Sequence, residues 1–216
     1  MTLSQFVTYV RNRHNAATDS NWSDPEIYAL ATGRCNEICS IIGMLEGTDT
    51  STTTVSGTQA YSFPTNFITV KALLYNGELL QPISFKDWES EKAGGVTPTG
   101  KSTKYVVWNS QVLLIPTPDA AYTLTFYGEK EHPLIDNSTQ LTIDIPSVLH
   151  YRLANGVIAD MASKDENWNM FNTFQGIWSN QDIPAFQRYA FLRKRRGRVR
   201  DVTDADTTIT TDLGVV

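Results

Sequence analysis

The sequence predicts an α+β fold in which helices from both ends of the chain form one helical core, with a small antiparallel β-sandwich or barrel inserted between them. Apolar residues recur at steps of three, four and seven in residues 3–45 and again after Pro146, which is the spacing of one helix face. Between these segments, short β-branched or aromatic runs alternate with turn residues. Neither helical part has enough partners to bury its apolar face alone, so we expect the two parts to pack together.

Two helices are predicted in the first helical part. The first is short and amphipathic, ends in the polar stretch 12–21, and buries Leu3, Phe6, Val7 and Val10. In the second, Ser23 or Asp24 serves as the N-cap and Pro25 lies in the first turn, where its missing N–H costs nothing. One face of this second helix carries Ile27, Leu30, Ala31, Ile38, Ile41, Ile42 and Leu45.

The β segment begins at Thr48, where Thr and Ser become frequent. Asn76-Gly77 lies between two apolar runs and is the strongest hairpin signal of the chain, and Asn109-Ser110 indicates a second hairpin. The stretch SFKDWESEK, 84–92, suits one or two helical turns. Strands are expected at 52–55, 59–63, 67–75, 78–83, 105–109, 111–115 and 122–127.

After Pro146 the helical spacing returns. The apolar positions Leu149, Leu153, Val157, Met161, Trp168, Phe171 and Trp178 predict one long helix, or two with a bend near 164–166. Asp182 is predicted to cap a further helix that has Pro184 in its first turn and runs to Gly197. The chain is thus divided into N-terminal helices 1–47, an inserted β domain 48–145, C-terminal helices 146–200 and an extended tail 201–216. The tail is polar and acidic, so in isolation we expect it to be disordered.

The stretch GVTPTGKS, residues 95–102, fits the phosphate-loop pattern G-x-x-x-x-G-K-[ST] letter for letter. Such a loop works between a buried parallel strand and a helix whose N–H groups converge on the phosphates. Here the charged stretch FKDWESEKAG precedes the motif, and strand-like runs around Asn109-Ser110 follow it. We therefore expect a flexible loop, and nucleotide hydrolysis that depends on Lys101 is the least favoured of three functional hypotheses.

Residues suited to chemistry are scattered. Cys35 and Cys39 lie four positions apart on a predicted helix, too far apart at Cβ for a disulfide, and are expected to be buried thiols. His14, His132 and His150 show no metal-ligand spacing. There is no nucleophile elbow and no dinucleotide fingerprint. We expect no enzymatic activity, no metal and no cofactor.

The composition indicates a globular protein, with 41% hydrophobic and 19% charged residues in a chain of 216. No apolar run approaches the roughly 20 residues that cross a bilayer. The opening MTLSQFVTYVRNRHN lacks the features of a secretion signal. We expect a soluble protein that is intracellular when made and has no membrane partner.

The stretch 98–145 and its continuation PSVLHYRLANGVIADMASKDENWNMFNTF resemble the head-to-tail adaptor (neck connector) proteins of tailed bacteriophages. The features that carry the resemblance are Pro98 and Tyr105 ahead of a strand, the run LLIPTPDAAYTLTFY, Pro133 after a Tyr-rich strand, and IPSVLHYRLANGVIADMASKDE. The opening TLSQFVTYVRNRHN and the stretch WSDPEIYALATGRCNEI are similar to the two N-terminal helices of that family. The resemblance spans most of the chain, and the order of these motifs carries it.

The resemblance implies a virion structural protein without enzymatic activity. Copies of such a protein, typically twelve, form a ring beneath the portal protein and present their other end to tail or nozzle proteins. DNA passes through the channel of the ring without sequence-specific binding. The expected location is the virion neck, and the host cytoplasm during assembly.

The charge of the chain is segregated. Residues 188–200 carry seven basic side chains and no acidic one, so the remaining 11 basic residues face 23 acidic ones, a net charge of −12. This division suits a heterologous contact in a ring or an acidic portal surface. A solvated helix end and direct contact with DNA are the alternatives, and a DNA-binding module that uses this helix is the second functional hypothesis. The partner-binding candidates are Arg188, Arg193, Lys194, Arg195, Arg196, Arg198 and Arg200.

Two further segments are candidates for contacts. In the tail, Thr207, Thr208, Ile209 and Thr210 lie between acidic residues and are predicted to add as a strand to another subunit or to the portal. The aromatic stripe Trp168, Phe171, Phe174 and Trp178 is predicted to lie in the core, with a subunit interface as the alternative.

Overall fold

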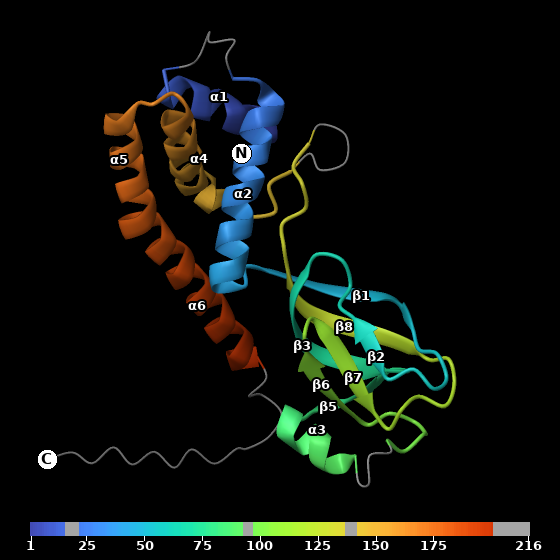
Figure 1. Ribbon diagram of the computed structural model, residues 1–216. Coiled ribbons are helices and arrows are strands. Elements are labelled where there is room, and N and C mark those ends of the chain that lie inside the picture. The colour runs from blue at the N-terminus through green and yellow to red at the C-terminus, as the bar shows by residue number, and fades with distance from the viewer. Residues whose placement is uncertain (16–21, 93–96, 137–141, 201–216) are drawn as a thin grey trace, which may run out of the picture.

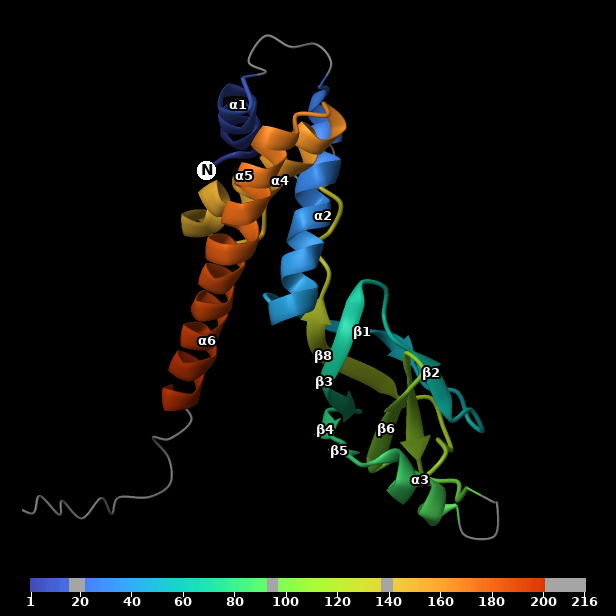
Figure 2. The same ribbon diagram turned by 60° about the vertical axis from the view of Figure 1, so that its left-hand side comes forward.

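The computed structural model describes residues 1–15, 22–92, 97–136 and 142–200, and for 194–200 it describes the helix backbone alone (Figure 1). The strands and one short helix gather at one end of the described structure and the other helices at the opposite end, as both views show (Figures 1 and 2). The predicted α+β fold, a helical core with an inserted antiparallel β module, is confirmed. The tail, 201–216, lies outside the described residues.

Each of the first two helices begins with a capping box. α1 (Leu3–Arg13) is capped by Thr2 and α2 (Asp24–Ile42) by Ser23, which is one of the two N-caps predicted for it. Each cap side chain accepts a hydrogen bond from the backbone N–H three residues on, and the Gln or Glu there bonds back to the cap N–H. These reciprocal bonds satisfy N–H groups that a helix start otherwise leaves unpaired.

The end of α2 differs from the prediction. Gly43 has a left-handed φ of 57° and its N–H donates to the Cys39 carbonyl at 2.9 Å, which ends the helix. The prediction that Leu45 lies on this helix is therefore wrong, because Leu45 begins the first strand. Ile41 was also predicted on the buried face and is 48% exposed. The periodic spacing of apolar residues overestimated the length of this helix, because that spacing contains no signal for the turn at Gly43.

Two four-stranded sheets form a sandwich, in the strand orders β1-β8-β3-β4 and β2-β7-β6-β5. Their bounds are β1 (Leu45–Thr53), β2 (Ala60–Ser62), β3 (Phe67–Tyr75), β4 (Glu78–Leu79), β5 (Gln81–Pro82), β6 (Lys104–Trp108), β7 (Gln111–Ile115) and β8 (Thr123–Lys130). All pairs are antiparallel except β5 with β6. The predicted strand 78–83 is split at buried Leu80, so that its two halves belong to different sheets. The short helix α3 (Phe85–Glu91) follows, capped by Ser84.

Both predicted hairpins are confirmed. At Asn76-Gly77 the φ angles are 52° and 82°, and β3 pairs with β4 across the turn. At Asn109-Ser110 they are 49° and 57°, and β6 pairs with β7 from Trp108 and Gln111 onward. Positive φ at both central residues is the geometry of the two-residue turn that matches strand twist.

From Ser147 to Arg200 the chain is almost entirely helical. It consists of η2 (Ser147–Leu149), α4 (His150–Lys164), α5 (Trp168–Ile177), the π-helical turn η3 (Trp178–Asp182) and α6 (Ile183–Arg200). The predicted bend is confirmed, because Glu166 has a φ of 55° and separates α4 from α5. From α5 to α6 the ribbon then runs the length of the helical end (Figure 2).

The prediction that Asp182 caps a new helix is wrong. The helix continues through η3, where the Ile183 N–H bonds five residues back to Trp178. Pro184 lacks an N–H and clashes with the carbonyl four residues earlier in a regular helix, and a π-turn just before it relieves that conflict. Asp182 is thereby buried, with 1% of its surface exposed.

The helices and the sandwich have separate hydrophobic clusters. The helical cluster joins α1, α2 and α4 to Trp178 and Phe186, and the sandwich cluster lies between the two sheets. After β8 the chain returns along α2, where the Ile135 N–H donates to Thr32 Oγ1 at 3.0 Å. N- and C-terminal helices thus share one core, and this core positions the surfaces described next.

Candidate interaction surfaces

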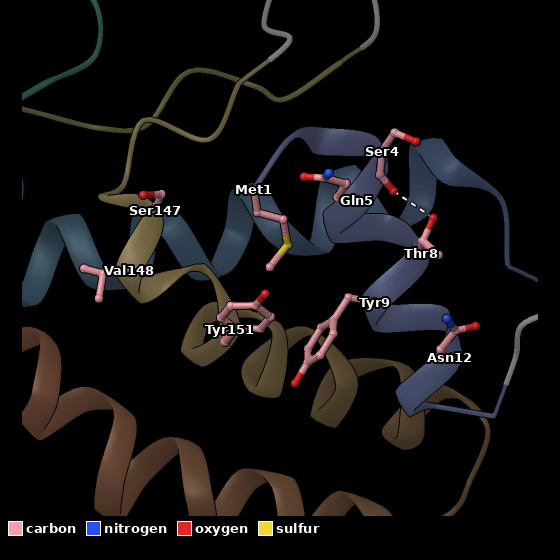
Figure 3. Close-up of a pocket in the computed structure, with 9 residues that line it drawn as sticks. All are labelled: Met1, Ser4, Gln5, Thr8, Tyr9, Asn12, Ser147, Val148 and Tyr151. Carbon is pink, nitrogen blue, oxygen red and sulfur yellow. Dashed lines mark hydrogen bonds between the residues drawn. The ribbon is translucent and has the colours of Figure 1, made fainter.

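A groove separates α1 from the start of α4 on the surface of the helical core (Figure 3). It measures about 690 Å³, and its lining is Met1, Ser4, Gln5, Thr8, Tyr9, Asn12, Ser147, Val148 and Tyr151. Val148 is 69% exposed and Tyr151 56%, and the rings of Tyr9 and Tyr151 meet edge to face at 5.0 Å. Large apolar side chains are thus presented to solvent beside a row of polar ones from α1.

A second hollow of about 440 Å³ continues the groove toward η3, since Tyr9, Val148 and Tyr151 line both. Arg13 and Arg152 are its basic residues. Arg13 is exposed, donates to Tyr9 Oη at 3.0 Å, and lies 5.4 Å above the ring centre of Phe174. Its guanidinium is therefore held in place by aromatic rings on one side and open to solvent on the other.

The acid of this hollow is neutralised within the chain. Asp182 Oδ1 accepts from Arg152 at 2.8 Å and Oδ2 accepts from Asn155 Nδ2 at 2.9 Å, and the Asp182 side chain is 2% exposed. Arg152 is 43% exposed, so part of its guanidinium faces solvent. The groove and the hollow therefore show net positive charge to a partner.

The basic candidates on α6 divide into three groups. Arg188 is exposed, and no ion pair holds it within the described chain. Arg193 instead donates to the Met44 carbonyl at 2.9 Å and to Glu46 Oε2 at 3.3 Å. Lys194, Arg195, Arg196, Arg198 and Arg200 lie on the helix backbone of α6, and their side chains lie outside the described part. The tail candidates Thr207, Thr208, Ile209 and Thr210 also lie outside it.

Arg193 belongs to a charged network at the junction of helices and sandwich, which the sequence analysis missed. Glu46 on β1 also binds Lys71 of β3 at 2.7 Å, and Lys71 binds Glu129 of β8 at 2.9 Å. These residues are separated by 25 to 147 positions in the chain, so no local spacing signals the network. The network links α6 to Met44 and to Glu46 at the start of β1.

Only part of the aromatic stripe lies in the core, and its alternative role as a subunit interface remains a prediction. Trp178 is 1% exposed and lies in the core, whereas Trp168 is 57% exposed on α5. Phe171 and Phe174 are half-buried, and no residue of α5 is fully buried. The stripe therefore changes from core to surface toward the start of α5.

The phosphate-loop match lies in a different setting from the one the motif requires. Ser102 is buried and donates to the Pro116 carbonyl at 2.7 Å, and Lys101 binds Glu78. Strand β6 begins at Lys104, where a phosphate loop needs a helix. Gly95 and Val96 lie outside the described residues.

The remaining titratable candidates have structural roles. Cys35 and Cys39 are free and buried, as predicted, and burial raises the pKa of Cys39 to about 11. The His132 ring accepts from the Asp144 N–H at 2.9 Å, and the His150 ring bonds the Ile145 carbonyl at 2.7 Å. Within the described ranges, three or more metal-type ligands do not gather at any point. Nor does any helix of this part have the length and apolarity to cross a membrane.

The fold is a helical core that carries an inserted β-sandwich, and its exposed apolar side chains are of the kind typical of contact sites. The family model described as "SU10 adaptor protein" matches residues 1–212. The chain belongs to this family of bacteriophage head-to-tail adaptors and has a structural role in the neck of the virion. None of the curated proteins matches the chain.

Proposed function

We propose that copies of this chain form a ring, of twelve subunits, beneath the portal protein of a tailed phage and join it to the tail or nozzle proteins. The ring extends the channel through which DNA passes, and it acts through its interfaces without catalysing a reaction. The observation that carries this proposal is the adaptor family match over nearly the whole chain. The exposed Val148 and Tyr151 of the groove and the exposed Trp168 ring of α5 support it, since such surfaces are typical of contact sites.

Electron microscopy of the purified chain mixed with the portal protein of its phage tests this proposal. We expect a closed ring stacked on the portal, with its copy number visible in end views. A chain that stays monomeric beside the portal at concentrations well above those of assembly would contradict the proposal.

The basic end of α6 is proposed to contact the portal or a neighbouring subunit. Arg188, Lys194, Arg195, Arg196, Arg198 and Arg200 are the candidates, whereas Arg193 already has partners within its own chain. Reversing two charges, with Arg195→Glu and Arg196→Glu, is expected to weaken portal binding about tenfold or more. Lys86→Glu, an exposed charge reversal on α3, serves as the matched control and should bind normally.

A DNA-binding module remains the second candidate, because α6 presents this basic sequence on one continuous helix. In that case the isolated chain is retained on duplex DNA, and retention falls steeply with salt. Retention lost in the Arg195→Glu, Arg196→Glu variant while portal binding stays intact would favour this function over the first. The tail residues Thr207, Thr208, Ile209 and Thr210 are proposed to dock on a neighbouring subunit or on the portal.

A further inference from the structure

The groove between α1 and α4, together with its basic extension, has properties that select a particular kind of partner. Its exposed side chains are apolar at Val148 and Tyr151 and basic at Arg13 and Arg152. The acid that lines it, Asp182, is buried and already paired. An extended segment that carries carboxylates between apolar residues would therefore complement this surface.

The chain itself contains such a segment. Residues 201–216, DVTDADTTITTDLGVV, have no Lys or Arg and carry the four acids Asp201, Asp204, Asp206 and Asp212. Apolar residues, including Ile209 and Leu213, lie between these acids and after the last of them. We infer that the groove of one copy receives the segment 201–216 of a second copy. This inference deepens the proposed function and rests on it, since copies of the chain must meet in one assembly.

Reach favours a second copy over the same chain. From Gln181, which lines the basic extension, the end of η3 and then α6 lead away to Arg200, about 28 Å along the helix axis at about 1.5 Å per residue. A tail that returned to its own groove would use about nine of its residues, at about 3.3 Å each, to cover that distance. Asp201, Asp204 and Asp206 would then lie short of the groove. A neighbouring groove near the end of α6 can receive all four acids.

The open edge of β1 is a poorer acceptor for the same segment. Among the strands that the structure describes, β1 pairs with β8 alone, so its other edge is open to a strand of another chain. However, β1 carries Asp49, and its register with β8 shifts between Asp49 and Thr52, while Glu46 is already paired with Lys71 and Arg193. An acidic strand added there would meet the like charge of Asp49 and an irregular ladder.

Cross-linking between variants of the full chain that each gain one exposed cysteine tests the inference. One variant carries Val148→Cys and the other Ile209→Cys, and the mixture is oxidised mildly and analysed by non-reducing electrophoresis. Cys35 and Cys39 are 0% and 1% exposed, so they stay out of the reaction. We expect a covalent dimer in about tenfold or greater excess over a mixture in which Leu134→Cys replaces Val148→Cys, because a docked segment raises the local thiol concentration. Leu134 is 62% exposed and lies outside the groove, and equal yields from the two mixtures would overturn the inference.

Two further variants make the test specific. Adding Arg13→Glu to the Val148→Cys variant is expected to lower the dimer yield about tenfold, because it reverses an exposed charge of the groove. A chain with both Val148→Cys and Ile209→Cys should give a ladder of linked copies. A fast-migrating monomer, cross-linked within one chain, would instead place the tail in its own groove and overturn the proposal of a second copy.

The same variants, assembled on the portal, separate this inference from the proposed function. Rings on the portal without the cross-link would overturn the inference and leave the adaptor function intact. Cross-linked chains that do not bind the portal would support the tail contact and contradict the proposed function.

Discussion

Gly156 lets α4 approach the long C-terminal helix closely. A Cβ atom at this position would lie 2.8 Å from a ring carbon of Trp178, closer than real Cβ contacts. The Trp178 ring cannot easily move, since it is 1% exposed, its Nε1 donates to Glu37 at 3.3 Å, and Arg34 lies 5.2 Å from the ring centre. One missing methyl group thus determines how α4 and η3 pack.

Gly156→Ala is therefore expected to lower the free energy of unfolding by about 1–3 kcal/mol, the usual cost of overpacking a core. Gly33→Ala on α2 is the matched control, because its new Cβ meets nothing within 4 Å. That change should raise the free energy of unfolding by up to about 1 kcal/mol, the helix preference of Ala over Gly. Urea denaturation of both variants checks this, and equal shifts would show that Trp178 has room to move.

His132 holds the segment that leads from β8 back to the helical core. Its backbone N–H donates to Asn36 Oδ1 at 2.7 Å, and its Nε2 accepts from the Asp144 N–H at 2.9 Å. An acceptor role for Nε2 requires the neutral ring, with the proton on Nδ1 directed at the Pro133 carbonyl. Burial lowers the pKa of His132 below its ordinary value of 6.5, although the Pro133 carbonyl and Asp144 oppose the shift.

The sign of the resulting pH dependence follows from that lowered pKa. Below about pH 6.5 the unfolded chain binds a proton at His132 that the folded chain does not. The free energy of unfolding therefore decreases as the pH is lowered, until the pKa of the folded state is reached. Above pH 6.5 this contribution is fully present. We expect His132→Asn to be less stable at neutral pH and to lose less stability than the unmodified chain between pH 7 and 5. Thermal denaturation at a series of pH values measures the difference, and parallel curves would contradict the assignment.

At the scale of elements, turns and helix irregularities determine which residues are buried. The π-turn η3 adds one residue to a helical turn and so rotates the helix after it relative to Trp178, and Asp182 and Phe186 are both buried. The hairpin at Asn109-Ser110 similarly sets the register of β6 with β7. Ser110 adopts a φ of 57°, a conformation that Gly takes at much lower cost.

Ser110→Gly is expected to raise the free energy of unfolding by about 0.5–1 kcal/mol, because it relieves a left-handed backbone at a turn that prefers Asn-Gly. The reciprocal change, Gly77→Ser, places a side chain at a φ of 82° and should lower stability by a similar amount. Chemical denaturation of both variants tests the pair. A loss of stability in Ser110→Gly would mean that the Ser110 side chain has a stabilising role.

For the whole molecule, the sandwich enters and leaves the helical core at one point. Leu45 pairs with Lys130 and Gly47 with Gly128 across β1 and β8, so the two ends of the insertion are adjacent. Of the described residues between 48 and 127, Ile68 alone is among the hydrophobic residues packed on the helical cluster. The helical core therefore depends little on the sandwich for its own burial.

Replacing residues 48–127 by an Asn-Gly turn that joins Gly47 to Gly128 should leave the helical core folded. This deletion retains the Glu46–Arg193 pair but removes Lys71, which binds Glu46 and Glu129, and the loss of Ile68 is expected to cost about 1–2 kcal/mol. A cooperative helical melting curve by circular dichroism is the expected result. An aggregated or non-cooperative product would show that the core needs the sandwich.

The sequence alone determined the order of helices and strands, both hairpins and the bend between α4 and α5, because caps, left-handed turns and periodic apolar positions act over about four residues. The same local reasoning failed at Leu45 and Asp182, where a glycine turn and a π-turn overrode the spacing. Only the tertiary structure decided that Arg193 binds Glu46 and that Tyr9, Val148 and Arg152 line one groove. These contacts join residues far apart in the chain, and packing of whole helices, not the properties of any short segment, brings them together.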